Sequence, residues 1–338
     1  MAFIQLSKDN FYHNLNQLAL KAGSLRKLAV VLKDNAYGHG LEPMAKMAAK
    51  FGVCEAVVAS NGEADRIAGL FDNVLVLGDV PRAMDGVSYA VSELEALRRI
   101  DPAVNVELKV DTGMHRNGLR MGELPEALRI VKERRINLFG VMTHYRSADE
   151  MTSEYFWQKK NFERAKEELA RAGFGGIRCH SHNSAALLRC GNFDETIARV
   201  GIAMYGYDPL PAGFSSIALR PVLSLWARRA STRDLERGER IGYGGDYVAE
   251  RAMRVSTYDL GYGDGWPRGE ASSPYVTEDG RTILGRVSMD FVSCEGKEET
   301  ICIMRDAARA ARHFGTIPYE MTTALMSTLP RIVVEERA

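Results

Sequence analysis

Cysteine is scarce in this chain of 338 residues, and it is not clustered. Five cysteines occur, and no two of them form a Cys-x-x-Cys pair. Zinc sites and disulfide frameworks depend on such spacings, so we expect neither, and we expect no metal site. The five are expected to be small buried side chains in a reducing compartment: Cys54, Cys179, Cys190, Cys294 and Cys302.

Net charge and long apolar runs are also missing, and the first residues do not show the pattern typical of a leader peptide. Lys+Arg and Asp+Glu both number 44, so no net field attracts nucleic acid or acidic membranes. No apolar run approaches the roughly 20 residues that span a bilayer. The first residues, MAFIQLSKDN, lack the basic and apolar regions of a signal peptide. We therefore expect a cytoplasmic globular protein, and 46% hydrophobic residues are enough for a sizeable core.

Between residues 9 and 218, short apolar runs alternate with segments of helical spacing, and Ser7 is a suitable N-cap for the first helix. Strands are expected at 28–32, 54–60, 73–78, 104–111, 137–145, 177–183 and 197–206, and helices at 41–52, 61–70, 92–100, 123–135 and 151–172. Repeated β-then-α units imply parallel strands joined by crossover helices. Seven or eight strands in about 200 residues predict a (β/α)8 barrel of the TIM type.

Polar side chains recur where these strands end, which is where such barrels carry their chemistry. They are Lys33, Lys109 with Asp111, His144, Asn183 with Ser184, and Arg199. Each alone has a structural explanation; His144, for example, could cap the core. Their shared position favours an active site.

Lys33 ends the apolar run at 28–32, and a turn punctuated by glycine follows. A lysine whose stem lies in apolar surroundings can supply an uncharged amine as a nucleophile or base. The alternative is a lysine that only extends from a strand end into solvent.

The pattern of apolar residues changes from mixed helical and strand spacing to mainly β-type runs after about residue 219. Apolar runs of β type occur at 222–229, 254–265, 273–293 and 299–304, and one helix is expected at 306–314. We predict a mainly antiparallel β domain over 219–338, with residues 1–8 available to pair with it.

Nine blocks along the chain resemble those of the alanine racemases, which are fold-type III enzymes that use pyridoxal 5'-phosphate (PLP). They read AVVLKDNAYGHG (29–40), LKVDTGMHRNGL (108–119), GVMTHYRSAD (140–149), HSHNSAALL (180–188), RVGIAMYGYDP (199–209), IGYGGDY (241–247), LGYGDGWPR (260–268), GRVSMD (285–290) and GTIPYE (315–320). Their order and their position at strand ends make the match specific. The resemblance implies a PLP-binding barrel with a β domain that interconverts L- and D-alanine and supplies D-alanine for peptidoglycan.

The resemblance also implies catalytic roles. Lys33 would bind PLP covalently and act as one base, and Tyr243 would act on the opposite face of the α-carbon. A relay from His144 to Arg199 would supply the positive charge that a phenol needs as a base. Arg199 would face the pyridine nitrogen; because a guanidinium only donates, that nitrogen stays unprotonated, which favours racemisation over transamination. Without the resemblance, Tyr243 would be read as a β-hairpin aromatic.

Binding roles follow in the same way. The implied cofactor contacts are Tyr37, Asn183, Ser184, Ser327 and the backbone amides of Gly201 and Ile202. The implied substrate contacts are Arg116, Lys109, Met289 and Asp290. The lysine that matches Lys109 is carbamylated in the family and orients the arginine; an ordinary lysine facing Asp111 is the alternative.

Family members are homodimers in which the β domain of one subunit completes the barrel mouth of the other. Tyr243, Met289 and Asp290 would then act on a partner's barrel. Tyr262, Arg268 and Asp149 match residues that line the substrate's access corridor, which would restrict substrates to small amino acids.

The chain departs from the family pattern near its end. Ser327 stands where many members carry a tyrosine that touches the phosphate and narrows the pocket, so we expect side activity on serine. Ser288 stands where cysteine is frequent, which matters little chemically. The segment 294–306 is also shorter than usual, so we expect the β domain to lack part of a hairpin.

Three other readings are weaker. A broader-specificity racemase or a basic amino-acid decarboxylase shares the fold, but decarboxylases place an acidic residue where Arg199 stands. A PLP-binding homeostasis protein has only the barrel, and the β domain argues against it. A purely structural protein leaves the polar strand ends unexplained.

Overall fold

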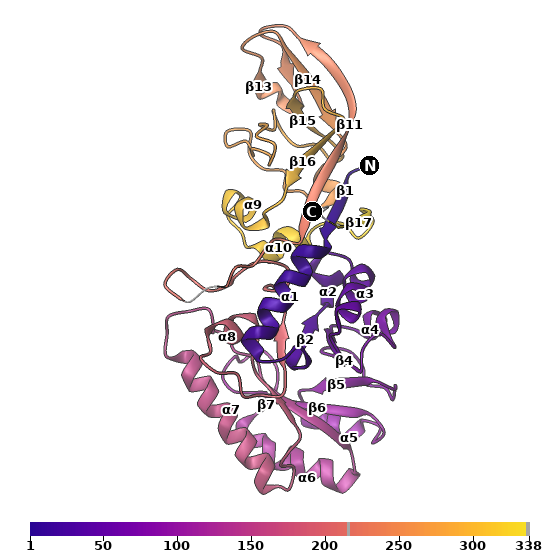
Figure 1. The fold of residues 1–338 in the computed structure, drawn as a ribbon, viewed down its shortest axis with the longest axis vertical. Coiled ribbons are helices and arrows are strands. Elements are labelled where there is room, and N and C mark those ends of the chain that lie inside the picture. The colour runs from indigo at the N-terminus through magenta and orange to yellow at the C-terminus, as the bar shows by residue number, and fades with distance from the viewer. Residues whose placement is uncertain (215–216, 336–338) are drawn as a thin grey trace. The chain divides into compact units, whose positions relative to one another are not determined.

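The computed structural model describes residues 1–214 and 217–335, in two compact units (Figure 1). The barrel unit consists of Tyr12–Asp34 and Met44–Arg220. The β unit consists of Met1–Phe11, Asn35–Pro43 and Pro221–Ala338. The segment that directly follows Lys33 and Asp34 therefore belongs to the β unit.

Parallel strands of the barrel unit form a nearly closed barrel, which confirms the predicted fold class. The eight strands along the main path of this sheet are ordered β10-β2-β3-β4-β5-β6-β8-β9, and the short β7 pairs with β6. Their bounds are β2 (Leu28–Val31), β3 (Glu55–Val58), β4 (Asn73–Val76), β5 (Val87–Val91), β6 (Asn105–Asp111), β7 (Leu119–Arg120), β8 (Asn137–Met142), β9 (Arg178–His180) and β10 (Ala198–Val200).

Helices connect these strands, and most lie where helical spacing predicted them. They are α1 (Lys8–Ala22), α3 (Leu41–Phe51), α4 (Asn61–Ile67), α5 (Leu94–Arg99), α6 (Leu124–Arg134), α7 (Glu154–Arg171) and α8 (Ser184–Arg189). Helix α1 begins after Ser7, whose Oγ accepts a hydrogen bond from Asn10 N at 3.2 Å, so the predicted N-cap is confirmed. Outside the strands, helix α6 packs against both α5 and α7 (Figure 1).

Strand β5 was not predicted. Its apolar run is interrupted by Ser88, which is polar yet fully buried. The hydroxyl of Ser88 donates to Glu107 Oε1 at 2.8 Å. A strand that contains such a buried polar residue is missed when strands are predicted from apolar periodicity alone.

The turn expected after Lys33 is instead a short helix, α2 (Lys33–Tyr37), with left-handed backbone angles. The φ values run from +51° to +55° over Asp34, Asn35, Ala36 and Tyr37. Left-handed helical residues other than glycine cost roughly 1–2 kcal/mol each. Such strain persists only where the surroundings hold it, so it marks the segment after Lys33 as a functional candidate.

The β unit contains a mainly antiparallel sheet ordered β15-β14-β11-β1-β17, with β16 also paired to β11. The bounds are β1 (Phe3–Ser7), β11 (Leu223–Leu235), β14 (Met253–Tyr258), β15 (Val292–Glu295), β16 (Thr300–Met304) and β17 (Arg331–Val334). Strand β1 pairs antiparallel with β11 and parallel with β17. A separate hairpin joins β12 (Arg240–Ile241) to β13 (Tyr247–Val248).

Two sequence expectations for the β unit were incomplete. The predicted run at 273–293 is mostly turns and irregular structure with a few isolated bridges, and β15 begins only at Val292. After the expected helix, which is α9 (Ala307–Phe314), a second helix α10 (Pro318–Thr323) packs against it. Within residues 1–214 and 217–335, no helix has both the length and the apolar character needed to cross a bilayer.

Candidate active site

Positive charge gathers around His144, which follows β8. Burial lowers the pKa of His144, and nearby cations lower it further, to about 3. These cations are Arg199, Arg116, Lys109 and Lys33. His144 is therefore neutral at physiological pH, with one ring nitrogen that donates and one that accepts.

Lys33 lies two residues beyond the end of β2 and opens the left-handed helix α2. Its side chain is 37% exposed, and Nζ lies 3.2 Å from Asp34 Oδ2. The amine is thus held at a strand end with access to small molecules.

Lys109 is buried near the end of β6. Its Nζ donates to Asn117 Oδ1 at 2.5 Å. Burial lowers the pKa of Lys109 to about 8, helped by the charges of Arg116 and Arg199. The carboxylate of Asp111 accepts hydrogen bonds from three backbone amides of the following loop, so its direct contacts are not with Lys109.

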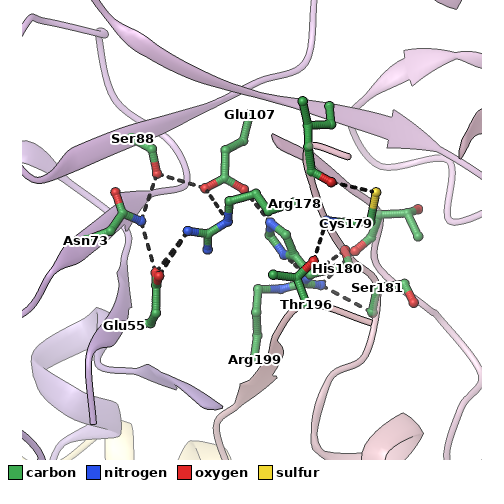
Figure 2. A network of polar contacts seen from close by, with 12 residues as sticks. Glu55, Asn73, Ser88, Glu107, Arg178, Cys179, His180, Ser181, Thr196 and Arg199 are labelled. Atoms are coloured by element: carbon green, nitrogen blue, oxygen red, sulfur yellow. Dashed lines mark hydrogen bonds and ion pairs between the residues drawn. The ribbon is translucent and has the colours of Figure 1, made fainter. Parts of the chain in front are cut away.

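Arg199 on β10 is almost fully buried, and its hydrogen bonds run toward β9 (Figure 2). Its Nη1 donates to His180 Nδ1 at 2.6 Å, and its Nη2 donates to Thr143 O at 2.7 Å. Burial lowers the pKa of Arg199 to about 10, so the guanidinium stays charged. His144 feels this charge, but the hydrogen bonds of Arg199 go to other groups.

A cluster of hydrogen-bonding groups forms where α8 contacts β10. Asn183 caps α8, because its Oδ1 accepts from Ala186 N at 2.9 Å. Ser184 Oγ accepts from Gly201 N at 3.0 Å and from Ala203 N at 3.3 Å, which leaves its own proton to donate. Ile202, between these two amides, is buried.

In the β unit, Tyr243, Tyr262 and Arg268 line one open basin, although the last of them lies 25 positions after the first. Tyr243 is 66% exposed. The predicted corridor residues Tyr262 and Arg268 thus line the same basin as the predicted base, Tyr243. The third corridor residue, Asp149, lies exposed in the barrel unit.

Three other predicted residues of the β unit, Met289, Asp290 and Ser327, lie in loops, and Tyr37 ends α2. Met289 O accepts from Gly263 N at 2.8 Å, and Met289 and Asp290 are both exposed. The ring of Tyr37 packs against Tyr319 with centroids 5.7 Å apart. Ser327 is exposed in a turn after α10.

Sequence reasoning missed four residues that shape these places: Glu107, Asn117, His180 and Gly261. Glu107 had a readable signal, because it shares a strand face with Lys109 in an otherwise apolar run. Gly261 had none: a Cβ there would lie 2.1 Å from Met289 O, a contact between segments far apart in the chain.

A parallel barrel that gathers polar and charged side chains at its strand ends, joined in sequence to a β unit, is the architecture of a barrel enzyme. The alanine racemase N-terminal domain matches residues 6–209, and the alanine racemase C-terminal domain matches residues 222–333. The chain belongs to the alanine racemase family. It is an isomerase, and its family supports racemisation of alanine.

Individual relatives agree over the full length. The alanine racemase of a Nitratiruptor species is 43% identical, covering 99% of this chain and 100% of that protein. The structure of alanine racemase from Bacillus anthracis with bound L-Ala-P is 29% identical, with a TM-score of 0.89, covering 99% of this chain and 95% of that chain. Alanine racemase from Bartonella henselae with covalently bound pyridoxal phosphate shares the fold at 21% identity, with a TM-score of 0.84, covering 98% of this chain and 99% of that chain.

Proposed function

We propose that this chain is a PLP-dependent alanine racemase with two acid/base groups, Lys33 and Tyr243, on opposite faces of the substrate's α-carbon. The observation that carries the proposal is that Lys33, Arg116 and Arg199 lie close enough to the neutral His144 to lower its pKa. Such a group suits a cofactor and a substrate that both carry negative charge.

The donor set of the barrel unit fits PLP. Lys33 offers an amine to the aldehyde, and Arg199 offers a fixed donor to the ring nitrogen. Ser184 keeps a free hydroxyl proton beside the amides around Gly201, which suits a phosphate. The further proposed contacts are Asn183 and Ile202 of the barrel unit, and Tyr37 and Ser327 of the β unit. When bound, PLP supplies the electron sink that makes the α-proton of alanine acidic.

Two groups of this chain then exchange protons with the α-carbon. Lys33 Nζ holds the proton on one face, and Tyr243 Oη holds it on the other. Because His144 is neutral, one of its ring nitrogens can accept a proton while the other donates. Arg199 stays charged, which stabilises negative charge that develops on the phenol.

The substrate carboxylate is proposed to bind Arg116, with Met289 and Asp290 beside it. A pKa of about 8 leaves a substantial uncharged fraction of Lys109 at neutral pH. The uncharged amine can add CO₂ and lose a proton, which gives a carbamate. That anion would lie among the cations that now depress the pKa of Lys109, and it would orient Arg116.

A homodimer is part of the proposal. Tyr243 and Met289 are 66% and 55% exposed, more than expected for residues that contact a substrate. Burial against the barrel of a second copy would explain both the exposure and the role. The product D-alanine would serve peptidoglycan synthesis in the cytoplasm.

Serine is proposed as a second substrate because Ser327 leaves room where a ring would narrow the pocket. We expect kcat/KM for L-serine above roughly 10⁻⁴ of that for L-alanine. A value below this limit contradicts the idea, and Ser327→Tyr should lower the serine activity selectively.

The proposal is tested by absorbance near about 420 nm, where a lysine-bound PLP absorbs, together with alanine racemisation in wild type and Lys33→Ala. Wild type should show both signals, and Lys33→Ala should lose both. Racemisation that survives in Lys33→Ala would contradict the assignment of Lys33.

A further inference from the structure

Behind Arg199, three side chains form a continuous hydrogen-bonded row inside the barrel (Figure 2). Glu107 on β6 contacts His180 on β9, and His180 contacts Arg199 on β10. Glu107 and His180 are fully buried. The proposed function uses only the last member of this row.

The donors in this row assign the protons. Arg199 Nη1 can only donate, so His180 Nδ1, 2.6 Å away, must accept. The proton of a neutral imidazole then lies on Nε2, which faces Glu107 Oε2. Both ends of His180 therefore require the same tautomer.

Glu107 is held as a carboxylate. Burial opposes its ionisation, but contacts with His180, Arg178 and Ser88 lower its pKa to about 2. Ser88 Oγ donates at 2.8 Å, and Arg178 Nε lies 3.5 Å from the same oxygen. An ionised carboxylate only accepts, so it cannot donate to Nε2 and stabilise the wrong tautomer.

We propose that Glu107 is a positioning residue that acts on Arg199 through His180. The carboxylate holds His180 in the tautomer that accepts from Nη1, while Thr143 O holds Nη2. The guanidinium is thereby fixed in plane and direction at the barrel mouth. This inference rests on the proposed role of Arg199 toward the cofactor.

The chain offers a matched control. Glu55 belongs to the same network and lies 3.1 Å from Arg178 Nη1, but it makes no contact with His180 among the described interactions (Figure 2). Glu107→Gln and Glu55→Gln each neutralise one carboxylate of the network. Only Glu107→Gln gives His180 a partner that can also donate.

Steady-state kinetics and PLP titration compare the two variants with wild type. Glu107→Gln should lower kcat about 10- to 100-fold and raise the dissociation constant of PLP, with the KM for alanine unchanged. Glu55→Gln should keep kcat and the PLP dissociation constant of wild type. Equal kinetics in the two variants would overturn the proposal.

A second readout does not depend on activity. Nitrogen NMR of the full-length protein with labelled histidine should show His180 as the neutral Nε2–H tautomer, and Glu107→Gln should add the Nδ1–H tautomer. An Nδ1–H or doubly protonated His180 in wild type would overturn the proposal even if Glu107→Gln failed to fold. A wild type that shows the Nε2–H tautomer but does not racemise alanine would refute the proposed function instead.

Discussion

His182 Nδ1 lies 3.0 Å from Glu195 Oε2, and both side chains are buried. His182 directly precedes Asn183 and Ser184 in the chain. Glu195 also accepts a hydrogen bond from Ser181 N at 2.6 Å. This buried pair therefore anchors the start of α8.

His182 and Glu195 each make the stability of the protein depend on pH, in two different pH ranges. Burial opposes the protonation of His182, but contacts with Cys190 and Glu195 raise its pKa to about 8. Because this value lies above the ordinary value of 6.5, the stabilisation is complete below pH 6.5 and is lost as pH rises through about 8. Glu195 has a pKa lowered to about 2, against the effect of burial, so its stabilisation is lost as pH falls from 4.5 toward 2.

We predict that the free energy of unfolding falls by about 2 kcal/mol through this pair between about pH 6 and pH 9. Urea unfolding of wild type and His182→Gln at both pH values isolates the contribution. The variant should show a smaller alkaline loss than wild type. Identical alkaline losses would show that His182 is not charged in the folded protein.

Ser184→Ala should weaken PLP binding and stability together. Two backbone amides, those of Gly201 and Ala203, would lose their acceptor, which costs about 1–3 kcal/mol for buried groups. Fluorescence titration with PLP should show about tenfold weaker binding.

Thr196→Val is the control, because Thr196 Oγ1 accepts from one backbone amide, that of Cys179, at 3.1 Å. It should cost less stability and leave PLP affinity unchanged. Equal PLP affinity in Ser184→Ala and wild type would remove Ser184 from the phosphate site.

Much of the barrel could be predicted because strands buried on both faces leave plain apolar runs separated by helical periodicity. Strand β5 was not predicted because its buried polar residue, Ser88, bonds to Glu107, a partner that only the folded sheet brings near. The left-handed helix after Lys33 was not predicted because, of residues 34–37, only Asp34 and Asn35 are of types that favour positive φ.

Some residues of the candidate site could likewise be predicted from the sequence, and others could not. Strand-end groups such as Lys33 and His144 could be found from topology, since parallel strands end at one mouth. Tyr243 could not, because its basin is assembled from loops that only the resemblance linked. Glu107 could be recognised as a charge on a strand, but its link to Arg199 through His180 joins three strands that only the fold brings together.

Gly261→Ala should damage the substrate contact of the β unit. The added Cβ would lie 2.1 Å from Met289 O, so the Met289 segment must shift. The KM for alanine should rise at least about tenfold, with a lower Tm. Gly175→Ala, which meets nothing within 4 Å, should behave as wild type. If Met289 has no role with the substrate, Gly261→Ala should lower the Tm but keep the wild-type KM for alanine.

Lys109 should carry a carbamate in the active protein. Mass spectrometry under native conditions should show a gain of one CO₂ per chain, and Lys109→Met should lose it. The same variant should raise the KM for alanine, because Arg116 loses its orienting anion. If the wild type is fully active without this modification, the carbamate has no role, and Lys109 acts only through its hydrogen bond to Asn117.

The central claim is that Lys33 and Tyr243 act on opposite faces of one carbon. Tyr243→Phe, incubated in D₂O with each enantiomer of alanine in turn, tests it most directly. Solvent deuterium should enter the α-position from one enantiomer only, while racemisation should fall by orders of magnitude. If Tyr243→Phe exchanges both enantiomers equally and racemises alanine like wild type, the two-base assignment is wrong.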